Sequence, residues 1–341
     1  MRTGIEEEDV AEIIRNLEGV RDEVEDKRVL VTGGAGFLGS WVCEVLVRLG
    51  AKVICLDNLA SGLESNVSPL FGFENFKFVK HDITKPIFFD ERIDVVMHLA
   101  SRASPLEFEK FPVQILKANT LGTWVALGIA KRHSARLLFA SSSEVYGVAA
   151  EVPTSEEYRG NVSPIGPRSC YDEGKRAGEA LCMAYMRQHG LDVRIARIFN
   201  TYGPRMRADG VYGRVIPRFI RQAMRNEPIT IFGDGTQTRS FCYVTDQVEG
   251  LLRLAFVGRK GAVVNIGNDE EVRIIELAVM IKRLTNSDSE MEFRPLPEDD
   301  PPRRRPDISK AKRLLGWEPK VGLEEGLRRM IRWFEESGKG E

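Results

Sequence analysis

A tyrosine and a lysine stand four residues apart in the segment YDEGK, as Tyr171 and Lys175. A helix through this segment would place both side chains on one face. A lysine ammonium and the positive nicotinamide of the NAD inferred below both favour the phenolate form of a nearby tyrosine, so we expect the pKa of Tyr171 to fall below its usual value of about 10. Such a phenolate can take a proton from a hydroxyl group. The alternative is an unreactive pair on a helix surface.

A glycine-rich turn, VTGGAGFLGS, carries Gly33, Gly36 and Gly39 directly after an apolar run. Glycines here allow backbone N–H groups to approach a pyrophosphate, and the N-terminus of the following helix adds partial positive charge. Asp57 ends the next apolar run. Its carboxylate can accept both ribose hydroxyls, which selects NAD and repels the 2′-phosphate of NADP. The pattern therefore predicts bound NAD, with a merely tight turn as the alternative.

Three polar residues, Ser142, Ser143 and Glu144, follow the apolar run at 136–141. If that run is a strand of a parallel sheet, they lie at its carboxyl edge. Ligands of such sheets bind at that edge. We therefore expect them at the ligand-binding edge of the sheet.

Alternating strands and helices must position these groups. Apolar, β-branched runs predict buried strands, and helical patterns fill 112–133 and 170–189. The order predicts an α/β fold with a doubly wound parallel sheet. The predicted strands are 28–32, 52–56, 76–79, 94–99, 136–141, 192–199, 229–232 and 263–266; further helices are predicted at 214–226, from 246 and at 322–337, and a Pro-rich loop at 295–307.

The composition excludes several classes of protein. The 341 residues carry 49 basic and 50 acidic side chains, so the balance favours neither nucleic acid nor an anionic membrane as partner. No apolar run approaches the ~18 residues of a membrane span. The acidic N-terminal segment lacks an apolar signal region, so we expect a cytoplasmic protein. Scattered cysteines and histidines predict reduced thiols and no metal site.

The motifs together resemble those of extended short-chain dehydrogenases that act on nucleotide sugars. Within that group the chain is similar to the UDP-glucuronate decarboxylase family, also called UDP-xylose synthases, from about Lys27 to Phe334. The matching segments are PIGPRSCYDEGKRAGE (164–179), ARIFNTYGPRM (196–206), TIFGDGTQTRSFCYVTD (230–246), VNIGN (264–268) and RRRPDISKAKRLLGWEP (303–319).

The resemblance implies an NAD site built from several parts. It assigns the pyrophosphate turn, the adenosine ribose, the adenine edge, the nicotinamide side and two further contacts, besides the Tyr171–Lys175 pair. The pyrophosphate turn is assigned to Gly33, Gly36, Phe37 and Leu38, and the adenosine ribose to Asp57, Asn58, Ser61 and Gly62. The adenine edge is assigned to Asp82 and Ile83, and the nicotinamide side to Leu99 and Ala100. The two further contacts are Thr201 and Arg214.

The resemblance also implies catalytic and substrate-binding roles. Ser142 corresponds to the hydroxyl partner of Tyr171, Glu144 to the catalytic glutamate, and Arg304 to the arginine that faces the sugar carboxylate. A buried ion pair is the alternative for Glu144, and a solvent or phosphate contact for Arg304. The implied UDP contacts are Asn200, Val215, Phe219, Phe232 and Arg239.

The implied reaction is decarboxylation of UDP-glucuronate to UDP-xylose and CO2, through oxidation at C4 and re-reduction. A UDP-sugar 4-epimerase acting on UDP-glucuronate or UDP-glucose, a nucleotide-sugar 4,6-dehydratase, a synthase that also makes a branched pentose and a non-enzymatic sensor are the alternatives. Arg102 stands where the family usually has proline, and Phe108 where it usually has tyrosine. The loop 205–214 is two residues longer than the common form. These departures bear on which sugar binds.

The resemblance implies an extended Rossmann fold with a smaller substrate-binding lobe. We expect an N-terminal helical extension at 1–27, an NAD-binding domain at 28–199 plus part of 229–266, and a nucleotide-sugar lobe at 200–228 plus 267–341. A homodimer through the helices 112–133 and 170–189 is also implied. An apolar stripe in the extension predicts a helix packed on its own domain, with an oligomer contact as the alternative; it consists of Val10, Ile13, Leu17, Val20 and Val24.

Overall fold

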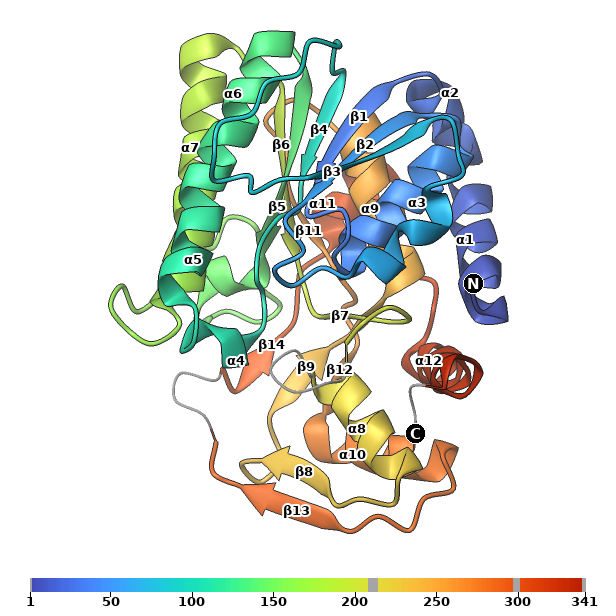
Figure 1. Ribbon diagram of the computed structural model, residues 1–341. Coiled ribbons are helices and arrows are strands. Elements are labelled where there is room, and N and C mark those ends of the chain that lie inside the picture. Colours follow the sequence, from blue (N-terminus) through green and yellow to red (C-terminus); the bar gives the residue numbers. More distant parts are fainter. Residues whose placement is uncertain (1, 208–213, 297–300, 339–341) are drawn as a thin grey trace.

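The computed structural model describes residues 2–207, 214–296 and 301–338, and in this part of the chain a seven-stranded parallel sheet forms the centre (Figure 1). The strand order is β11-β6-β5-β4-β1-β2-β3. This confirms the predicted α/β, doubly wound fold. The strands are β1 (Arg28–Thr32), β2 (Lys52–Asp57), β3 (Phe76–Lys80), β4 (Val95–His98), β5 (Arg136–Ser142), β6 (Val193–Ile198) and β11 (Val263–Ile266).

Helices cover both faces of the sheet, which is why most of its strands read as continuous apolar runs. One face carries α5 (Pro112–Lys117), the π-helical turn η4 (Ala118–Gly122), α6 (Thr123–His133) and α7 (Ser169–His189). The other face carries α3 (Phe37–Arg48), α9 (Val244–Val257) and α11 (Ser309–Leu315). No helix in the described ranges is both long and apolar enough to span a membrane.

The strand order reverses at β1, whose neighbours are β2 and β4. From β1 the chain continues through β2 to β3 on one side, whereas β4 is followed by β5 and β6 on the other side. A crevice therefore opens at the carboxyl ends of the strands, where such folds bind ligands.

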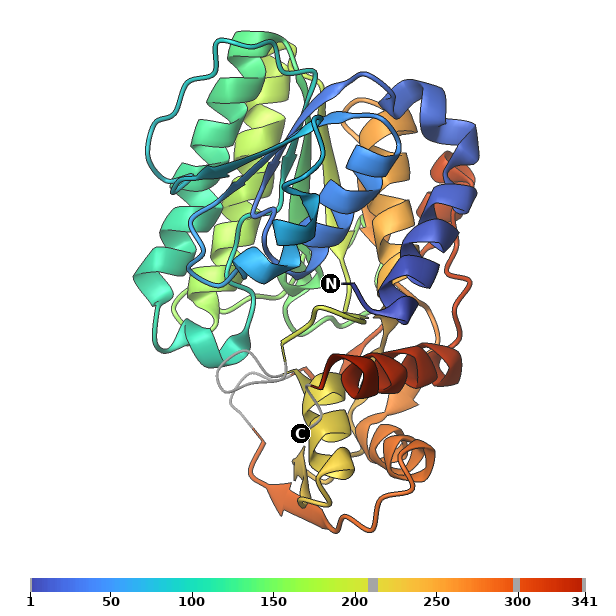
Figure 2. The ribbon, with the colours of Figure 1, turned by 45° about the vertical axis from the view of Figure 1, so that its right-hand side comes forward.

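A smaller lobe lies beyond this edge of the sheet (Figures 1 and 2). Its strands pair in small sheets: β8 (Ile229–Phe232) with β13 (Met291–Arg294), and β9 (Thr238–Ser240) with both β12 (Glu271–Arg273) and β14 (Arg303–Arg304). Its helices are α8 (Val215–Met224), α10 (Ile274–Leu284) and α12 (Leu323–Ser337). Of the predicted strands in 229–266, only β11 joins the central sheet. The Pro-rich segment predicted as a loop contains β14.

Short elements connect these layers. The pair β7 (Thr201–Tyr202) and β10 (Cys242–Tyr243) links the lobe to the sheet. The others are η1 (Glu18–Val20), α2 (Arg21–Val24), η2 (Glu64–Asn66), η3 (Ser68–Leu70), α4 (Pro105–Phe108) and η5 (Ser143–Tyr146).

The N-terminal extension packs on its own chain. Helix α1 (Gly4–Asn16) contacts α3, α9 and α12. Thr3 and Glu6 form a capping box at its start. The whole predicted stripe is buried within this chain, which supports the intramolecular interpretation over an oligomer contact; it comprises Val10, Ile13, Leu17, Val20 and Val24.

Candidate active site

A cavity of about 710 Å³ runs along the carboxyl ends of the central strands. Its length and lining suit an elongated dinucleotide. Most of the residues predicted to bind the cofactor line it, together with Ser142: Gly33, Gly36, Phe37, Leu38, Asp57, Asn58, Ser61, Gly62, Asp82, Ile83, Leu99, Ala100, Tyr171, Lys175 and Arg214.

The glycine-rich turn has room only for glycine at two positions. Gly33 has a φ of +71°, and a Cβ there would lie 2.7 Å from the backbone of Ala100. A Cβ on Gly39 would lie 2.1 Å from the carbonyl oxygen of Gly33. Helix α3 begins at Phe37 without a side-chain cap. Its first backbone N–H groups are thus available to an anion, and this cradle fits a dinucleotide diphosphate.

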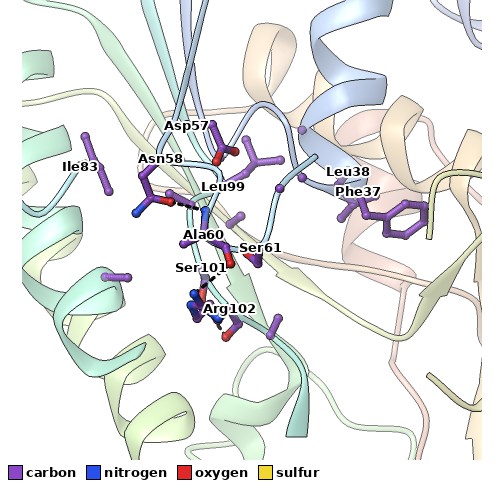
Figure 3. Close-up of a pocket in the computed structure, with 18 of the residues that line it drawn as sticks. Phe37, Leu38, Asp57, Asn58, Ala60, Ser61, Ile83, Leu99, Ser101 and Arg102 are labelled. Carbon is purple, nitrogen blue, oxygen red and sulfur yellow. Dashed lines mark hydrogen bonds between the residues drawn. The ribbon is translucent and has the colours of Figure 1, made fainter. Parts of the chain in front are cut away.

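Asp57 lies at the end of β2 with its carboxylate fixed by the backbone. One oxygen accepts a hydrogen bond from Leu59 N at 2.8 Å, and the other from Ala35 N at 3.0 Å. Burial raises the pKa of Asp57. Figure 3 shows Asp57 close to Asn58 and Ser61, and Asn58 Oδ1 accepts from Ala60 N at 2.9 Å. These groups suit the hydroxyls of a ribose.

Tyr171 and Lys175 share the buried face of α7 at the end of β5. Lys175 Nζ donates to Ala140 O at 2.8 Å and lies 5.7 Å from the ring centroid of Tyr171. Burial raises the pKa of Tyr171 to about 12, although a hydrogen bond with Ser142 acts in the opposite direction. Burial lowers the pKa of Lys175 to about 7.

The predicted fall in the pKa of Tyr171 includes the positive charge of a bound nicotinamide, so the chain by itself does not test it. Burial removes water from both groups, so it disfavours the phenolate and the ammonium alike. Bringing the phenolate within reach of neutral pH requires a further positive charge at this site.

Phe108 stacks on the ring of Tyr171, with centroids 5.0 Å apart and an angle of 16° between the planes. Phe108 is itself buried, and the guanidinium of Arg168 lies 5.6 Å from its ring centroid. This aromatic side chain therefore packs against Tyr171 and fixes the orientation of its ring.

Glu144 is held between two arginines. Its carboxylate pairs with Arg304 on β14 and accepts from Arg168 Nη2 at 2.6 Å. Burial raises the pKa of Glu144, but the charges of Arg304 and then Arg168 outweigh it and lower the pKa to about 2. In this state Glu144 is a carboxylate in a buried ion pair.

Arg304 keeps unused hydrogen-bonding capacity. It is 8% exposed, and its Nη2 has no hydrogen-bond partner within the described residues. On the neighbouring strand Arg239 is its register partner. Two adjacent arginines at the mouth of the smaller lobe favour an anionic ligand.

Other predicted contacts lie outside the cavity lining in the described part of the chain. The hydroxyl of Thr201 bonds Phe199 O and Gln247 Oε1, each at 3.0 Å. Asn200 lies between β6 and β7. The predicted UDP contacts Val215 and Phe219 lie on α8, Phe232 on β8 and Arg239 on β9. The predicted lengthening of the loop 205–214 falls largely on 208–213, outside the described residues.

Three arginines in the lining received no role from the sequence: Arg102, Arg205 and Arg207. Arg102 pairs with Glu107 and donates to Ala60 O at 2.9 Å, so it bridges two loops of the cavity (Figure 3). Arg205 also lines the cavity. Arg102 stood out only as a departure from the family, and Arg205 only as part of the segment GPRM.

Comparison with known proteins shows which proteins this chain is similar to. Residues 29–267 match the model of the NAD dependent epimerase/dehydratase family. UDP-glucuronic acid decarboxylase 1 of Danio rerio is 50% identical over 312 residues, 92% of this chain and 73% of the relative. UDP-glucuronic acid decarboxylase 6 of Arabidopsis thaliana is 51% identical over 301 residues, 88% and 86% of the two chains. An epimerase from Methanothermobacter thermautotrophicus has a similar structure, with a TM-score of 0.85, 35% identity and coverage of 95% and 97%.

Proposed function

Because the chain belongs to the NAD dependent epimerase/dehydratase family, we propose that it is an NAD-dependent UDP-glucuronate decarboxylase. It converts UDP-glucuronate to UDP-xylose and CO2. The observation that carries this proposal is about 50% identity to UDP-glucuronic acid decarboxylases over most of the chain. The buried, incompletely paired Arg304 beside Glu144 supports it, because an acidic sugar requires a cation at its carboxylate.

The two parts of the fold bind different ligands. The central sheet holds NAD through the glycine-rich turn, Asp57 and the neighbouring loops. The smaller lobe holds the nucleotide sugar through α8, β8 and β9. The reacting atoms then meet at the carboxyl end of β5, where Ser142, Tyr171 and Lys175 lie.

Tyr171 is the base for the 4-hydroxyl of the sugar. Its hydroxyl is buried and hydrogen-bonded to Ser142, so the oxygen is held in place before the proton moves. NAD supplies the hydride acceptor and a positive ring that favours the phenolate. Lys175, fixed by Ala140 O, adds its charge when protonated.

The oxidised sugar has a ketone at C4 and a carboxylate on C5. A carboxylate in this β relation leaves as CO2 because the remaining electron pair delocalises into the ketone as an enolate. Ser142 and Tyr171 hydrogen-bond that oxygen as its charge grows. Protonation at C5 and return of hydride to C4 complete UDP-xylose.

Arg304 receives the sugar carboxylate. Its Nη1 is engaged by Glu144, whereas Nη2 is unpaired in the described residues. A substrate carboxylate can thus bind Nη2 or displace Glu144 and take both nitrogens of the fork. Glu144 keeps Arg168 as a partner in either case.

Proton NMR of the purified protein with UDP-glucuronate, with and without added NAD, tests the function. UDP-xylose is the expected product. Turnover without added NAD shows a cofactor that is retained and recycled. Accumulation of UDP-galacturonate instead would make the protein a 4-epimerase, and unchanged UDP-glucuronate in both tubes would contradict the proposed substrate.

We also propose that the protein is a homodimer through α5, α6 and α7. Large apolar side chains of α5, η4 and α6 are 42–58% accessible, namely Val113, Leu116, Leu121 and Trp124. Exposed apolar patches are typical of interfaces. Light scattering after size exclusion should give a dimer for the native chain and a monomer for Trp124→Glu. A monomeric native chain would contradict the proposal.

A cytoplasmic location is proposed on the state of the thiols. All five cysteines are free and buried in the described structure. Unpaired thiols are usual in a reducing compartment. Fractionation of the cells that make the protein should recover it with cytosolic markers.

A further inference from the structure

The N-terminal extension contacts Arg205, a residue that lines the cofactor cavity. This side chain lines the cavity together with Gly36, Phe37 and Leu38, which form the diphosphate cradle. It is only 3% exposed. A buried arginine requires negative charge beside it. An arginine that lines a ligand cavity also favours an anionic ligand.

The guanidinium of Arg205 is fixed on three sides. Its Nε donates to Glu6 Oε1 of α1 at 2.7 Å, and its Nη2 donates to Glu44 Oε2 of α3. The guanidinium carbon lies 4.0 Å from the ring centroid of Trp41. Because the fork is planar, these contacts set its orientation. The third nitrogen, Nη1, is buried and has no hydrogen-bond partner in the described ranges.

The backbone beneath Arg205 is also constrained. Arg205 has a φ of +70°, a region that residues other than glycine seldom occupy. Trp41 Nε1 donates to the preceding carbonyl, Pro204 O, at 3.1 Å. Strained backbone of this kind persists where its surroundings fix it, and it concentrates at ligand sites.

The extension reaches the glycine-rich turn by a second route. Arg2 pairs with Glu44 at 2.8 Å and donates to Asn66 O at 2.7 Å. The side chain of Asn66 in turn donates to Ala35 O, within the turn, at 3.0 Å. The first residues of the chain therefore contact α3 and Arg205, and they are linked to the turn through Asn66.

The charges in this cluster are balanced. Burial raises the pKa of Glu6, but the charge of Arg205, the hydrogen bonds with Thr3 and Arg205 and the charge of Arg2 together lower the pKa below its usual value. The pKa of Glu44 is lowered in the same way. Both groups are therefore carboxylates, and Glu6 orients Arg205, whose Nη1 has no hydrogen-bond partner in the described ranges.

We propose that Arg205 binds the diphosphate of NAD through Nη1, and that the N-terminal extension positions it there through Glu6. The extension is then a device for retaining the cofactor between turnovers. The proposal rests on the proposed function only for the identity of the cofactor.

The rate of NAD release from the purified holoenzyme, measured without any UDP-sugar, tests the proposal. Glu6→Gln and Arg205→Ala should each release NAD about tenfold faster, the loss expected for one charged hydrogen bond. Glu8→Gln is the matched control, because Glu8 lies on the same helix and pairs with Arg332 at the surface. It should change the rate less than about twofold.

A second ligand locates the contact. ADP-ribose keeps the diphosphate and lacks nicotinamide, so its affinity should fall by the same factor as that of NAD. If only NAD is affected, the contact is not with the diphosphate and the proposal fails.

The thermal midpoint of the cofactor-free protein separates retention from folding. Unchanged NAD release in Glu6→Gln, with a lowered midpoint, would give α1 a purely structural role and overturn the proposal. Equal acceleration in Glu8→Gln would do the same. If Arg205→Ala does not fold, the near-isosteric Glu6→Gln decides. Since no sugar is present, failure of the decarboxylase assignment leaves this test intact.

Discussion

The reactivity of Tyr171 depends on groups that act against its burial. Burial raises its pKa to about 12, because the hydrogen bond with Ser142 offsets the effect of burial only in part. Phe108 stacks on its ring and restricts its movement. The hydroxyl oxygen is therefore well placed, and its deprotonation depends on positive charge brought to the site.

Tyr171→Phe removes the proposed base and keeps the aromatic stacking. We expect turnover of UDP-glucuronate to fall by about 10²–10⁴-fold, the usual contribution of general acid–base catalysis. Tyr185→Phe, on the same helix, is the control and should leave turnover unchanged. Rates from product NMR, with thermal midpoints to confirm folding, decide the matter; full activity of Tyr171→Phe rules out the mechanism.

Arg304→Ala tests the proposed carboxylate contact. Loss of a charge-assisted hydrogen bond should lower kcat/KM for UDP-glucuronate by roughly 10- to 100-fold. The affinity for UDP alone should change less than about twofold. Arg303→Ala is the matched control, since the neighbouring Arg303 is exposed and pairs with Glu271. Equal losses for UDP and UDP-glucuronate would assign Arg304 to a phosphate.

At the scale of elements, the periodicity of apolar residues predicted the strands of the central sheet. The apolar runs at 28–32 and 136–141 are buried strands because both faces of the sheet are covered. Short strands such as β9 and β14 were not predicted. Two or three residues show no period, and their pairing depends on contacts distant in sequence.

In the candidate site too, some residues could be predicted from local sequence and others could not. Gly33, Asp57 and Lys175 could be predicted because their roles follow from local spacing, and all line one cavity. Arg205 could not, because its partners Glu6 and Glu44 lie far away in sequence and only the folded chain brings them together. The same holds for the pairing of Glu144 with Arg304.

The buried stripe of α1 should stabilise the whole domain. Ile13 is fully buried within this chain, so Ile13→Ala should lower the free energy of unfolding by about 2–5 kcal/mol through lost burial and a residual cavity. Ile165→Ala makes the same chemical change at a side chain that is 92% exposed and should cost less than about 0.5 kcal/mol. Denaturant titrations measure both. Equal costs at the two positions would mean that the stripe does not pack as described.

At the scale of the molecule, the sheet and its helices are joined through buried polar groups as well as apolar ones. His98 ends β4, and its Nδ1 lies 2.7 Å from Thr32 Oγ1 on β1. Its Nε2 lies 3.2 Å from Thr123 Oγ1 on α6. This histidine thus connects two strands and a helix beneath the cofactor cavity.

Protonation of His98 should limit the stability of the fold in acid. Burial, and then the charge of Lys175, lowers its pKa from 6.5 to about 3. Between these values the unfolded chain binds a proton at His98 that the folded chain does not, so the contribution of His98 to stability is complete above about pH 6.5 and falls as the pH drops, by up to about 1.4 kcal/mol per unit. The exposed His189 supplies the control variant, His189→Gln, which should keep this slope, whereas His98→Gln should reduce it. Free energies of unfolding from urea titrations between about pH 5 and 7 give the two slopes. Identical slopes in His98→Gln and the native chain would show that another group controls acid stability.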